Sequence, residues 1–403
     1  MKSEKPSGGD DAGAAQEIVF VLKASKFCNL RCAYCYEHRE LHVRDVMRLD
    51  TLARLFEDVD RFGDHLLSLG VSPAFSFVWH GGEPLLIARD YYAQIVQMQK
   101  MSIRRFPYRN SVQTNLVGSV ADTLQFVVES GWQLGVSIDF AGGVRTNAGG
   151  RDSNASVIAA AERLRKSGGR FGAISVLGTH NCGTLVEMYD WVAEFADGWR
   201  ILPVFDGGPE DAIEDLRLSE GAIVDFFVQL LKRRARAARH VPIAPLDGYI
   251  SAAALKIADQ RRPGDVTRHL LDNIYLVNVN GDVFTRPFAY ETEFCLGNIQ
   301  HTSMVDIVEH ATYRACQRAI RQRKICNCAS CEFRGFCDST PMHEHGSVTR
   351  EEDGLRCFVT RRAIAATEAC FVASGVDRKL LATWAADEMA ARRPACVPAS
   401  GSA

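Results

Sequence analysis

The sequence lacks the features of a membrane protein, of a nucleic-acid-binding protein and of an exported protein. No apolar run approaches the roughly 20 residues that a spanning helix needs. The formal net charge is only −2, so no strong positive surface favours nucleic acid or an anionic membrane as partner. Residues 1–17 are small and polar, which predicts a disordered tail and not a signal peptide. We therefore expect a cytoplasmic protein.

Cysteine, in contrast, is plentiful. The chain of 403 residues contains 13 cysteines, and without an export signal these predict thiolate ligands in a reducing compartment instead of disulfides. Seven of them form two spaced groups, Cys28, Cys32 and Cys35 near the start and Cys328, Cys331, Cys337 and Cys357 near the end. Each of the other six, Cys295 and Cys326 included, is more typical of a small buried hydrophobe or an idle thiol.

The first group directly follows a strand-like run at residues 18–22. A loop with thiols at i, i+4 and i+7 can direct all three at one centre. A cubane iron–sulfur cluster has four irons, each usually held by one cysteine thiolate, so three ligands leave one iron open to another molecule. The alternative is a structural zinc site with His38 as fourth ligand, since Zn²⁺ favours four nitrogen or sulfur ligands.

From residue 18 to 240, strand-like and helix-like segments alternate. We expect strands at 18–22, 74–79, 111–114, 133–138, 171–177 and 200–204, with amphipathic helices between them. Such a pattern predicts an α/β fold of parallel βα units, and six units make a partial (β/α)6 barrel similar to a TIM barrel. Chemistry in such barrels lies at the C-terminal ends of the strands, which is where the first cysteine group stands.

After residue 240 the pattern changes. We expect a bridging segment at 241–310 with a β-hairpin turning at Asn280-Gly281, since this dipeptide suits a type I′ turn. A small metal-binding domain follows at 311–360, and a helix with a tail at 361–403. The spacing of the second cysteine group closes a four-ligand site, for which zinc and an iron–sulfur cluster are equally suitable.

The segment Gly81-Gly82-Glu83-Pro84 follows the second strand. Two glycines allow the backbone to approach a ligand closely, and the carboxylate of Glu83 is able to accept hydrogen bonds from an ammonium group. A simple glycine–proline turn is the plainer interpretation.

Polar side chains also end the next two strands. Gln113 and Asn115 end the third strand, Ser137 and Asp139 the fourth, and capping of the strand ends is the plainer role for all of them. Arg145 and Arg151 follow in the next loop, where a guanidinium group could pair with a carboxylate through two hydrogen bonds or simply be a surface charge.

The first cysteine group, with the aromatic Tyr34 before its third cysteine, resembles the cluster loop of the radical S-adenosylmethionine (SAM) enzymes. The resemblance implies a [4Fe–4S] cluster whose open iron binds SAM, and one-electron cleavage of SAM to a 5′-deoxyadenosyl radical. It also implies that Gly81-Gly82-Glu83 contacts the SAM amino group, and that an arginine near 145 or 151 binds the SAM carboxylate. The residues at the ends of the third and fourth strands resemble substrate-side and ribose-contacting positions. The glycine that usually follows the aspartate is Phe140 here.

The second cysteine group resembles that of the SPASM subgroup, which usually carries two auxiliary clusters. Cysteines that the subgroup would have are missing near Arg286-Pro287 and at Pro341. The resemblance therefore implies a small C-terminal iron–sulfur domain with one complete auxiliary [4Fe–4S] cluster, with Cys295 and Cys326 as minor candidates for further ligands.

The resemblance further implies a peptide as substrate and a low-potential reductant such as flavodoxin or ferredoxin as partner. Our leading prediction is a maturase that installs a carbon–carbon (cyclophane) or thioether cross-link in a ribosomally made precursor peptide. The alternative is an anaerobic sulfatase-maturating enzyme that forms formylglycine, which would be expected to keep both auxiliary clusters. A radical SAM enzyme acting on RNA would need a basic face, and an inactive metal-binding protein would not cleave SAM.

Overall fold

A computed structural model of the chain describes residues 16–118, 120–204, 210–261, 273–285, 292–337 and 357–391. Residues 1–15 of the expected tail lie outside these ranges, as do Arg286, Pro287 and Pro341, where cysteines are missing.

One ten-stranded sheet organises the described chain, in the order β12-β11-β10-β1-β3-β4-β5-β7-β8-β9. The six expected strands are all present as parallel neighbours: β1 (Gln16–Ser25), β3 (Pro73–Gly81), β4 (Tyr108–Thr114), β5 (Gln133–Ser137), β7 (Gly172–Leu177) and β8 (Gly198–Pro203). The short β9 (Ile243–Ala244) pairs in parallel with β8 at one edge.

The hairpin that was expected in the bridging segment joins this sheet. Its first strand, β10 (Ile274–Val277), pairs in parallel with β1, and β11 (Asp282–Thr285) and β12 (Gly297–Asn298) continue the sheet in antiparallel order. The sheet is therefore wider than six strands. A separate two-stranded ribbon pairs β2 (Leu30–Cys32) with β6 (Arg145–Asn147).

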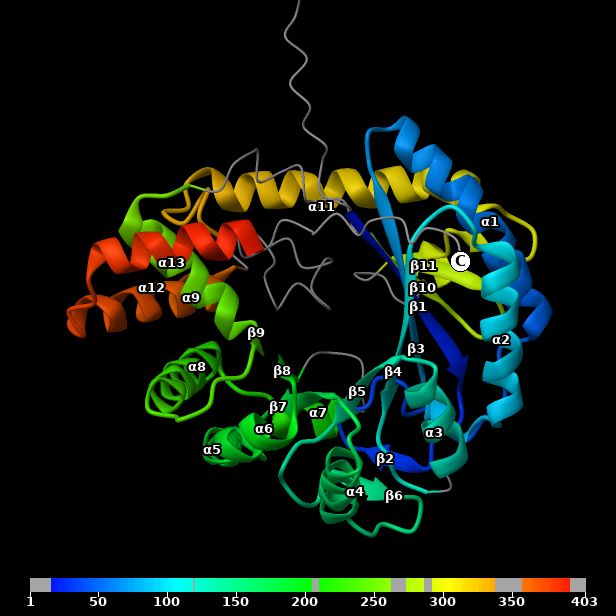
Figure 1. The fold of residues 1–403 in the computed structure, drawn as a ribbon, viewed down its shortest axis with the longest axis horizontal. Helices are drawn as coiled ribbons and strands as arrows, with labels where there is room; N and C mark the ends of the chain where they lie inside the picture. Colours follow the sequence, from blue (N-terminus) through cyan, green and yellow to red (C-terminus); the bar gives the residue numbers. More distant parts are fainter. Residues whose placement is uncertain are drawn as a thin grey trace, which may run out of the picture.

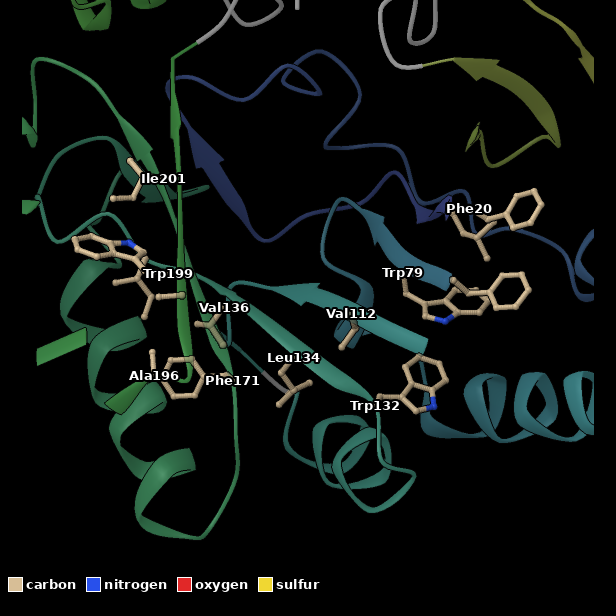
Figure 2. Close-up of a cluster of buried hydrophobic side chains, with 14 of the residues drawn as sticks. Phe20, Trp79, Val112, Trp132, Leu134, Val136, Phe171, Ala196, Trp199 and Ile201 are labelled. Carbon is tan, nitrogen blue, oxygen red and sulfur yellow. The ribbon is translucent and has the colours of Figure 1, made fainter. Parts of the chain in front are cut away.

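The core lies between the sheet and the helices on its outer side. Side chains alternate along a strand, so Phe77 and Trp79 of β3 and Val112 of β4 are fully buried toward the helices. Figure 2 shows Trp79, Val112 and Trp199 among the residues of this layer. The helices that cover the sheet are α1 (Leu49–Ser68), α2 (Arg89–Ser102), α3 (Ala121–Glu129), α4 (Asn154–Lys166), α5 (Cys182–Glu187), α6 (Tyr189–Phe195) and α8 (Glu220–Ala235) (Figure 1).

Helix boundaries differ from the sequence pattern in the C-terminal part. The sequence pattern predicts one helix from Met304 to about Arg323. The structure has two helices there, α10 (Met304–Glu309) and α11 (Ala311–Ala329), and α11 extends far enough to include Cys326 and Cys328. The long α11 spans from the side of α1 to a group formed by α9 (Leu246–Ala258), α12 (Phe358–Ala373) and α13 (Arg378–Ala391) (Figure 1). In the described ranges, no helix is long and apolar enough to cross a membrane.

Candidate active site

The three cysteines of the first group meet in one small apolar cluster at the end of β1. Cys28 is buried together with Leu30 and Leu41, and the side chains of Cys32 and Cys35 pack against them. The ribbon of β2 and β6 fixes the middle of this loop, because Cys32 pairs directly with Arg145. All three thiols are free.

This environment fits a metal cluster better than free thiols. Burial raises the pKa of Cys28 and of Cys35 to about 12, so without a positive partner these groups stay protonated. A cluster would supply the positive charge that stabilises the thiolates. Within the part of the chain that the structure describes, no three cysteine, histidine or acidic side chains form a group able to hold one metal ion. In a cubane each thiolate binds a different iron, so its ligands stand further apart than those of a zinc ion.

Gly81 and Gly82 bring the end of β3 against the cysteine loop. Gly82 N–H donates to Ser25 O at 2.7 Å, and Glu83 N–H donates to Phe27 O at 2.8 Å. A Cβ atom would lie 2.2 Å from Ser25 O at position 81 and 2.1 Å from Phe27 O at position 82. The φ angle of Gly81, 112°, is also one that other residues rarely adopt. Glycine is thus required at both positions because the end of β3 packs closely against the backbone of the cysteine loop. The sequence pattern had indicated close approach to a ligand instead.

The carboxylate of Glu83 is buried, with 1% of the residue exposed, and it accepts three hydrogen bonds. Oε1 accepts from Leu85 N–H at 3.1 Å and from the Thr114 hydroxyl at 2.8 Å, and Oε2 accepts from Asn115 N–H at 2.7 Å. Burial raises the pKa of Glu83 to about 7, although these hydrogen bonds oppose the shift. Glu83 therefore joins the end of β3 to the end of β4.

Asn115 continues this network to the cysteine loop. Its Nδ2 donates to Asn29 Oδ1 at 2.9 Å and lies 3.8 Å from Cys28 Sγ. Gln113, one residue before the end of β4, and Ser137, the last residue of β5, lie on the same inner face of the sheet and are half-buried. The structure thus brings Glu83 and Asn115 together with Cys28.

A second buried network joins Tyr34, Asp139 and Arg145. The Tyr34 hydroxyl donates to Asp139 Oδ2 and accepts from Arg145 Nη1 at 2.9 Å, and Arg145 Nη1 lies 3.5 Å from Asp139 Oδ2. The other oxygen, Oδ1, accepts from Val176 N–H at 2.8 Å. The Nε atom of Arg145 is buried and has no hydrogen-bond partner among the described residues, so it remains available to an anionic ligand. Arg151, the other candidate, is exposed and away from this network.

Phe140 replaces the glycine that the resemblance led us to expect, and the loop nevertheless keeps a glycine-like conformation. Its φ angle is 57°, in the left-handed region, which costs other residues about 1–2 kcal/mol. Its ring packs edge-on against Trp191, with centroids 5.1 Å apart, and burial of the ring offsets this cost.

Several polar residues on the inner face were not predicted from the sequence. Lys23 is nearly buried, and its Nζ lies 2.5 Å from Glu37 Oε2. His80 lies on β3 beside Tyr36, and His180 follows β7 with its ring centroid 6.1 Å from that of Tyr34. Both ring nitrogens of His180 are buried without a hydrogen-bond partner among the described residues. The sequence did contain a signal for two of them: side chains alternate along a strand, and a charged or polar residue follows the apolar Leu22 and Trp79.

The second cysteine group lies around the end of α11: Cys328 is on its last turn, and Cys331 and Cys337 are on the following turn, which docks on α9 and α12. Phe333 anchors the turn at 1% exposure, and Cys331 and Cys337 pack against the main core. Lys256 of α9 contacts Glu332 at 3.1 Å and Glu368 of α12 at 2.7 Å, and Arg361, one helical turn after Cys357, lies 3.5 Å from Glu332. Cys357 immediately precedes α12 and is thereby held near the turn. The exposed Cys326 lies on α11, and the thiol of Cys295 donates to Gly297 O at 3.6 Å.

Two family models match the chain. Residues 22–192 match the radical SAM superfamily, and residues 269–332 match the iron–sulfur cluster-binding domain named SPASM. The chain therefore carries a radical SAM domain and is an enzyme. More particularly, it carries a SPASM domain behind the radical SAM domain, which confirms the predicted α/β fold with a C-terminal iron–sulfur domain. The predicted cofactors, SAM and two [4Fe–4S] clusters, are confirmed as well.

The similar proteins with described activities are anaerobic sulfatase-maturating enzymes. A serine-type anaerobic sulfatase-maturating enzyme of Bacteroides thetaiotaomicron is 24% identical over 84% of this chain and 85% of its own length. A cysteine-type enzyme of Clostridium perfringens is 25% identical over 72% of this chain and 80% of its own. Among solved structures, anSMEcpe with bound AdoMet and Cp18Cys peptide superposes with a TM-score of 0.69 at 17% identity, covering 93% of this chain and all of the other.

The predicted cross-linking maturase is contradicted by these comparisons. SuiB of Streptococcus suis bound to the precursor peptide SuiA gives a TM-score of only 0.53 at 14% identity, covering 80% of this chain and 71% of that one. The match to sulfatase-maturating enzymes is longer and closer, so the alternative is the better supported of the two functions. The missing auxiliary cysteines are therefore weaker evidence against sulfatase maturation than the sequence pattern suggested.

Proposed function

We propose that this enzyme oxidises a serine or cysteine side chain of a sulfatase polypeptide to formylglycine. The observation that carries the proposal is the match to a serine-type sulfatase-maturating enzyme over 84% of this chain and 85% of that protein, since it spans both domains. The structural match to anSMEcpe, solved with a bound peptide, supports a peptide segment as substrate.

Bound SAM and its cluster would supply the 5′-deoxyadenosyl radical, which removes hydrogen from the carbon to be oxidised. Cys28, Cys32 and Cys35 would hold that cluster, since they share one apolar cluster of side chains in which free thiolates are unstable. The protein's own task is to bind SAM, orient it and keep water away.

The two buried networks divide this binding task. Glu83 would accept from the SAM ammonium group at the end of β3, and Gly81 and Gly82 allow the close packing that places it there. The unpartnered Nε of Arg145 would bind the SAM carboxylate. Tyr34 and Asp139 hold the guanidinium group of Arg145 in place. Three further polar residues at the strand ends, Ser137, Asn115 and Gln113, would complete the polar lining of the SAM site.

The auxiliary cluster would be held by Cys328, Cys331, Cys337 and Cys357. Four protein thiolates leave it no open iron, so it suits outer-sphere electron acceptance after hydrogen removal. A low-potential electron carrier such as flavodoxin or ferredoxin would supply the electron that begins each cycle.

The test uses the anaerobically reconstituted full chain with SAM, dithionite and sulfatase-derived peptides that carry serine or cysteine at the modified position. We expect an aldehyde product that reacts with a hydrazide probe, formed together with 5′-deoxyadenosine. A peptide with alanine at that position is the matched control. Formation of 5′-deoxyadenosine without an aldehyde from either peptide would contradict the proposal.

A further inference from the structure

Helix α9 contacts both chain segments that carry the second cysteine group. Cys331 and Cys337 lie on the turn after α11, and Cys357 immediately precedes α12. The helix α9 packs against α12 and α13 (Figure 1), and its Leu255 is buried together with Phe336 of the turn. Because α9 lies outside residues 22–192 and 269–332, neither of the matching family models covers it.

The side chain of Lys256 on α9 joins the two segments. Its Nζ atom lies 3.1 Å from Glu332 Oε2 and 2.7 Å from Glu368 Oε2. Glu332 directly follows a cysteine of the turn, and Glu368 belongs to α12, the helix that begins after Cys357. The same ammonium group lies 4.4 Å from the ring centroid of Phe333, the buried anchor of the turn. One cation therefore holds the turn and α12 together.

Two arginines support this connection. Arg361 Nη2 lies 3.5 Å from Glu332 Oε1, and its backbone N–H donates to Cys357 O at 3.0 Å in the first turn of α12. Arg261, which follows α9, donates from Nη1 to Arg334 O at 3.0 Å. The turn is thus held from both sides by contacts that involve no cysteine side chain.

The charges in this group are balanced and only partly screened by solvent. Lys256 and Arg361 compensate the two carboxylates, and the side chains of Lys256 and Glu368 are 24% and 25% exposed. A four-iron cluster held by four thiolates is anionic and gains a further negative charge when it is reduced. A nearby cation therefore stabilises the reduced cluster and raises its reduction potential, whereas a nearby carboxylate lowers it.

We propose that Lys256 is a positioning residue for the auxiliary cluster: it holds the cysteine turn against α12 and, by balancing Glu332 and Glu368, keeps the reduction potential high enough for electron acceptance. This inference rests on the proposed function and on the ligands proposed for the auxiliary cluster. In that reaction the substrate radical transfers one electron to the cluster and releases the hydroxyl or thiol proton to water, which leaves the oxidised side chain.

The experiment is a redox titration of the anaerobically reconstituted full chain, followed by electron paramagnetic resonance. SAM binds only to an open iron, so the signal that SAM leaves unchanged belongs to the auxiliary cluster. Lys256→Met should shift the auxiliary potential to a lower value, and Lys256→Arg should restore it. Glu368→Gln should shift it to a higher value. Loosened packing alone would not produce shifts of opposite sign.

Lys166→Met is the matched control. Lys166 on α4 also has a carboxylate partner, Glu162 at 3.6 Å, and an aromatic neighbour, Phe195 at 6.0 Å, but it belongs to the radical SAM domain. This variant should leave the auxiliary potential unchanged. With peptide, Lys256→Met should form less aldehyde per 5′-deoxyadenosine than the wild type, and Lys166→Met should form the same amount.

Iron content shows whether each variant keeps both clusters. If Lys256→Met loses the auxiliary cluster, the opposite shift in Glu368→Gln still tests the charge effect. An unchanged potential in a Lys256→Met sample of full iron content, or a shift in the same direction for Lys256→Met and Glu368→Gln, would overturn the inference. An unchanged aldehyde ratio despite a lowered potential would overturn the link to electron acceptance. The titration needs no peptide, so an aldehyde from neither peptide would instead refute the proposed function.

Discussion

Replacement of Arg145 by methionine tests the buried network that holds the cysteine loop against the end of β5. Asp139 is completely buried, and Arg145 is the cationic partner that compensates its charge at 3.5 Å. Methionine retains much of the side-chain volume but removes the charge and the donor to Tyr34. The change therefore isolates electrostatics and hydrogen bonding from packing.

The expected loss of unfolding free energy depends on the hydrogen bonds that Asp139 keeps in the variant. Removing one partner of a buried ion pair typically costs about 3–5 kcal/mol. Asp139 retains hydrogen bonds from Val176 N–H and from the Tyr34 hydroxyl, so we expect a loss of about 3 kcal/mol. Tyr34→Phe should cost about 2 kcal/mol, and the double variant less than the sum, because both changes act on Asp139.

Urea unfolding in anaerobic buffer, followed by tryptophan fluorescence, measures these losses on samples of equal iron content. Arg151→Met is the matched control, since Arg151 is exposed on the following loop and should change stability by less than about 0.5 kcal/mol. Titration with SAM should show weaker binding for Arg145→Met than for the wild type, and unchanged binding for the control Arg151→Met. A stability loss below about 1 kcal/mol for Arg145→Met would refute the role of this ion pair.

Three further predictions concern the cofactors. Reconstituted protein should hold about eight irons, and the variant with Cys28, Cys32 and Cys35 all changed to alanine about half as many; about twelve irons in the wild type would reveal a further cluster. Because burial raises the pKa of Glu83 to about 7, its carboxyl group is protonated below that pH. The carboxyl group must then lose its proton before it can bind the SAM ammonium group. SAM affinity should therefore fall by up to about tenfold per pH unit below about pH 7, whereas Glu83→Gln should bind weakly with no such slope, as calorimetry at several pH values would show. Cys331→Ala should still cleave SAM but form no formylglycine, and aldehyde at wild-type yield from a variant shown to lack the auxiliary cluster would exclude electron acceptance by that cluster.

The strands and the cysteine loop were predictable because their signals are local. Apart from the mostly polar strand at 111–114, the expected strands are short runs rich in apolar residues, and three thiols within eight residues strongly favour a shared metal centre. The sequence pattern also predicts one helix at 184–196. The structure has two helices there, α5 and α6, and the break between them at Met188 has no proline or glycine to mark it.

Contacts between distant segments were not predictable in the same way. Cys32 pairs with Arg145, which is 113 positions further along the chain. Because of this pairing, Arg145 and not Arg151 lies in the site. Likewise, β10 pairs with β1 on the far side of the sheet from β9, the strand that precedes it in the chain, and a local sequence pattern does not encode this pairing. The type of reaction was predicted wrongly because cysteine spacing reports which clusters are held, whereas the product depends on what the inner face of the sheet binds.

The central claim, oxidation of a side chain at its β carbon, is tested most directly by isotope transfer. A sulfatase-derived peptide with serine deuterated at Cβ is incubated with the reduced enzyme and SAM, and 5′-deoxyadenosine is analysed by mass spectrometry. We expect one deuterium in 5′-deoxyadenosine for each formylglycine formed, and none when the label is at Cα. Transfer from Cα, or deuterated 5′-deoxyadenosine without any aldehyde, would contradict the claim.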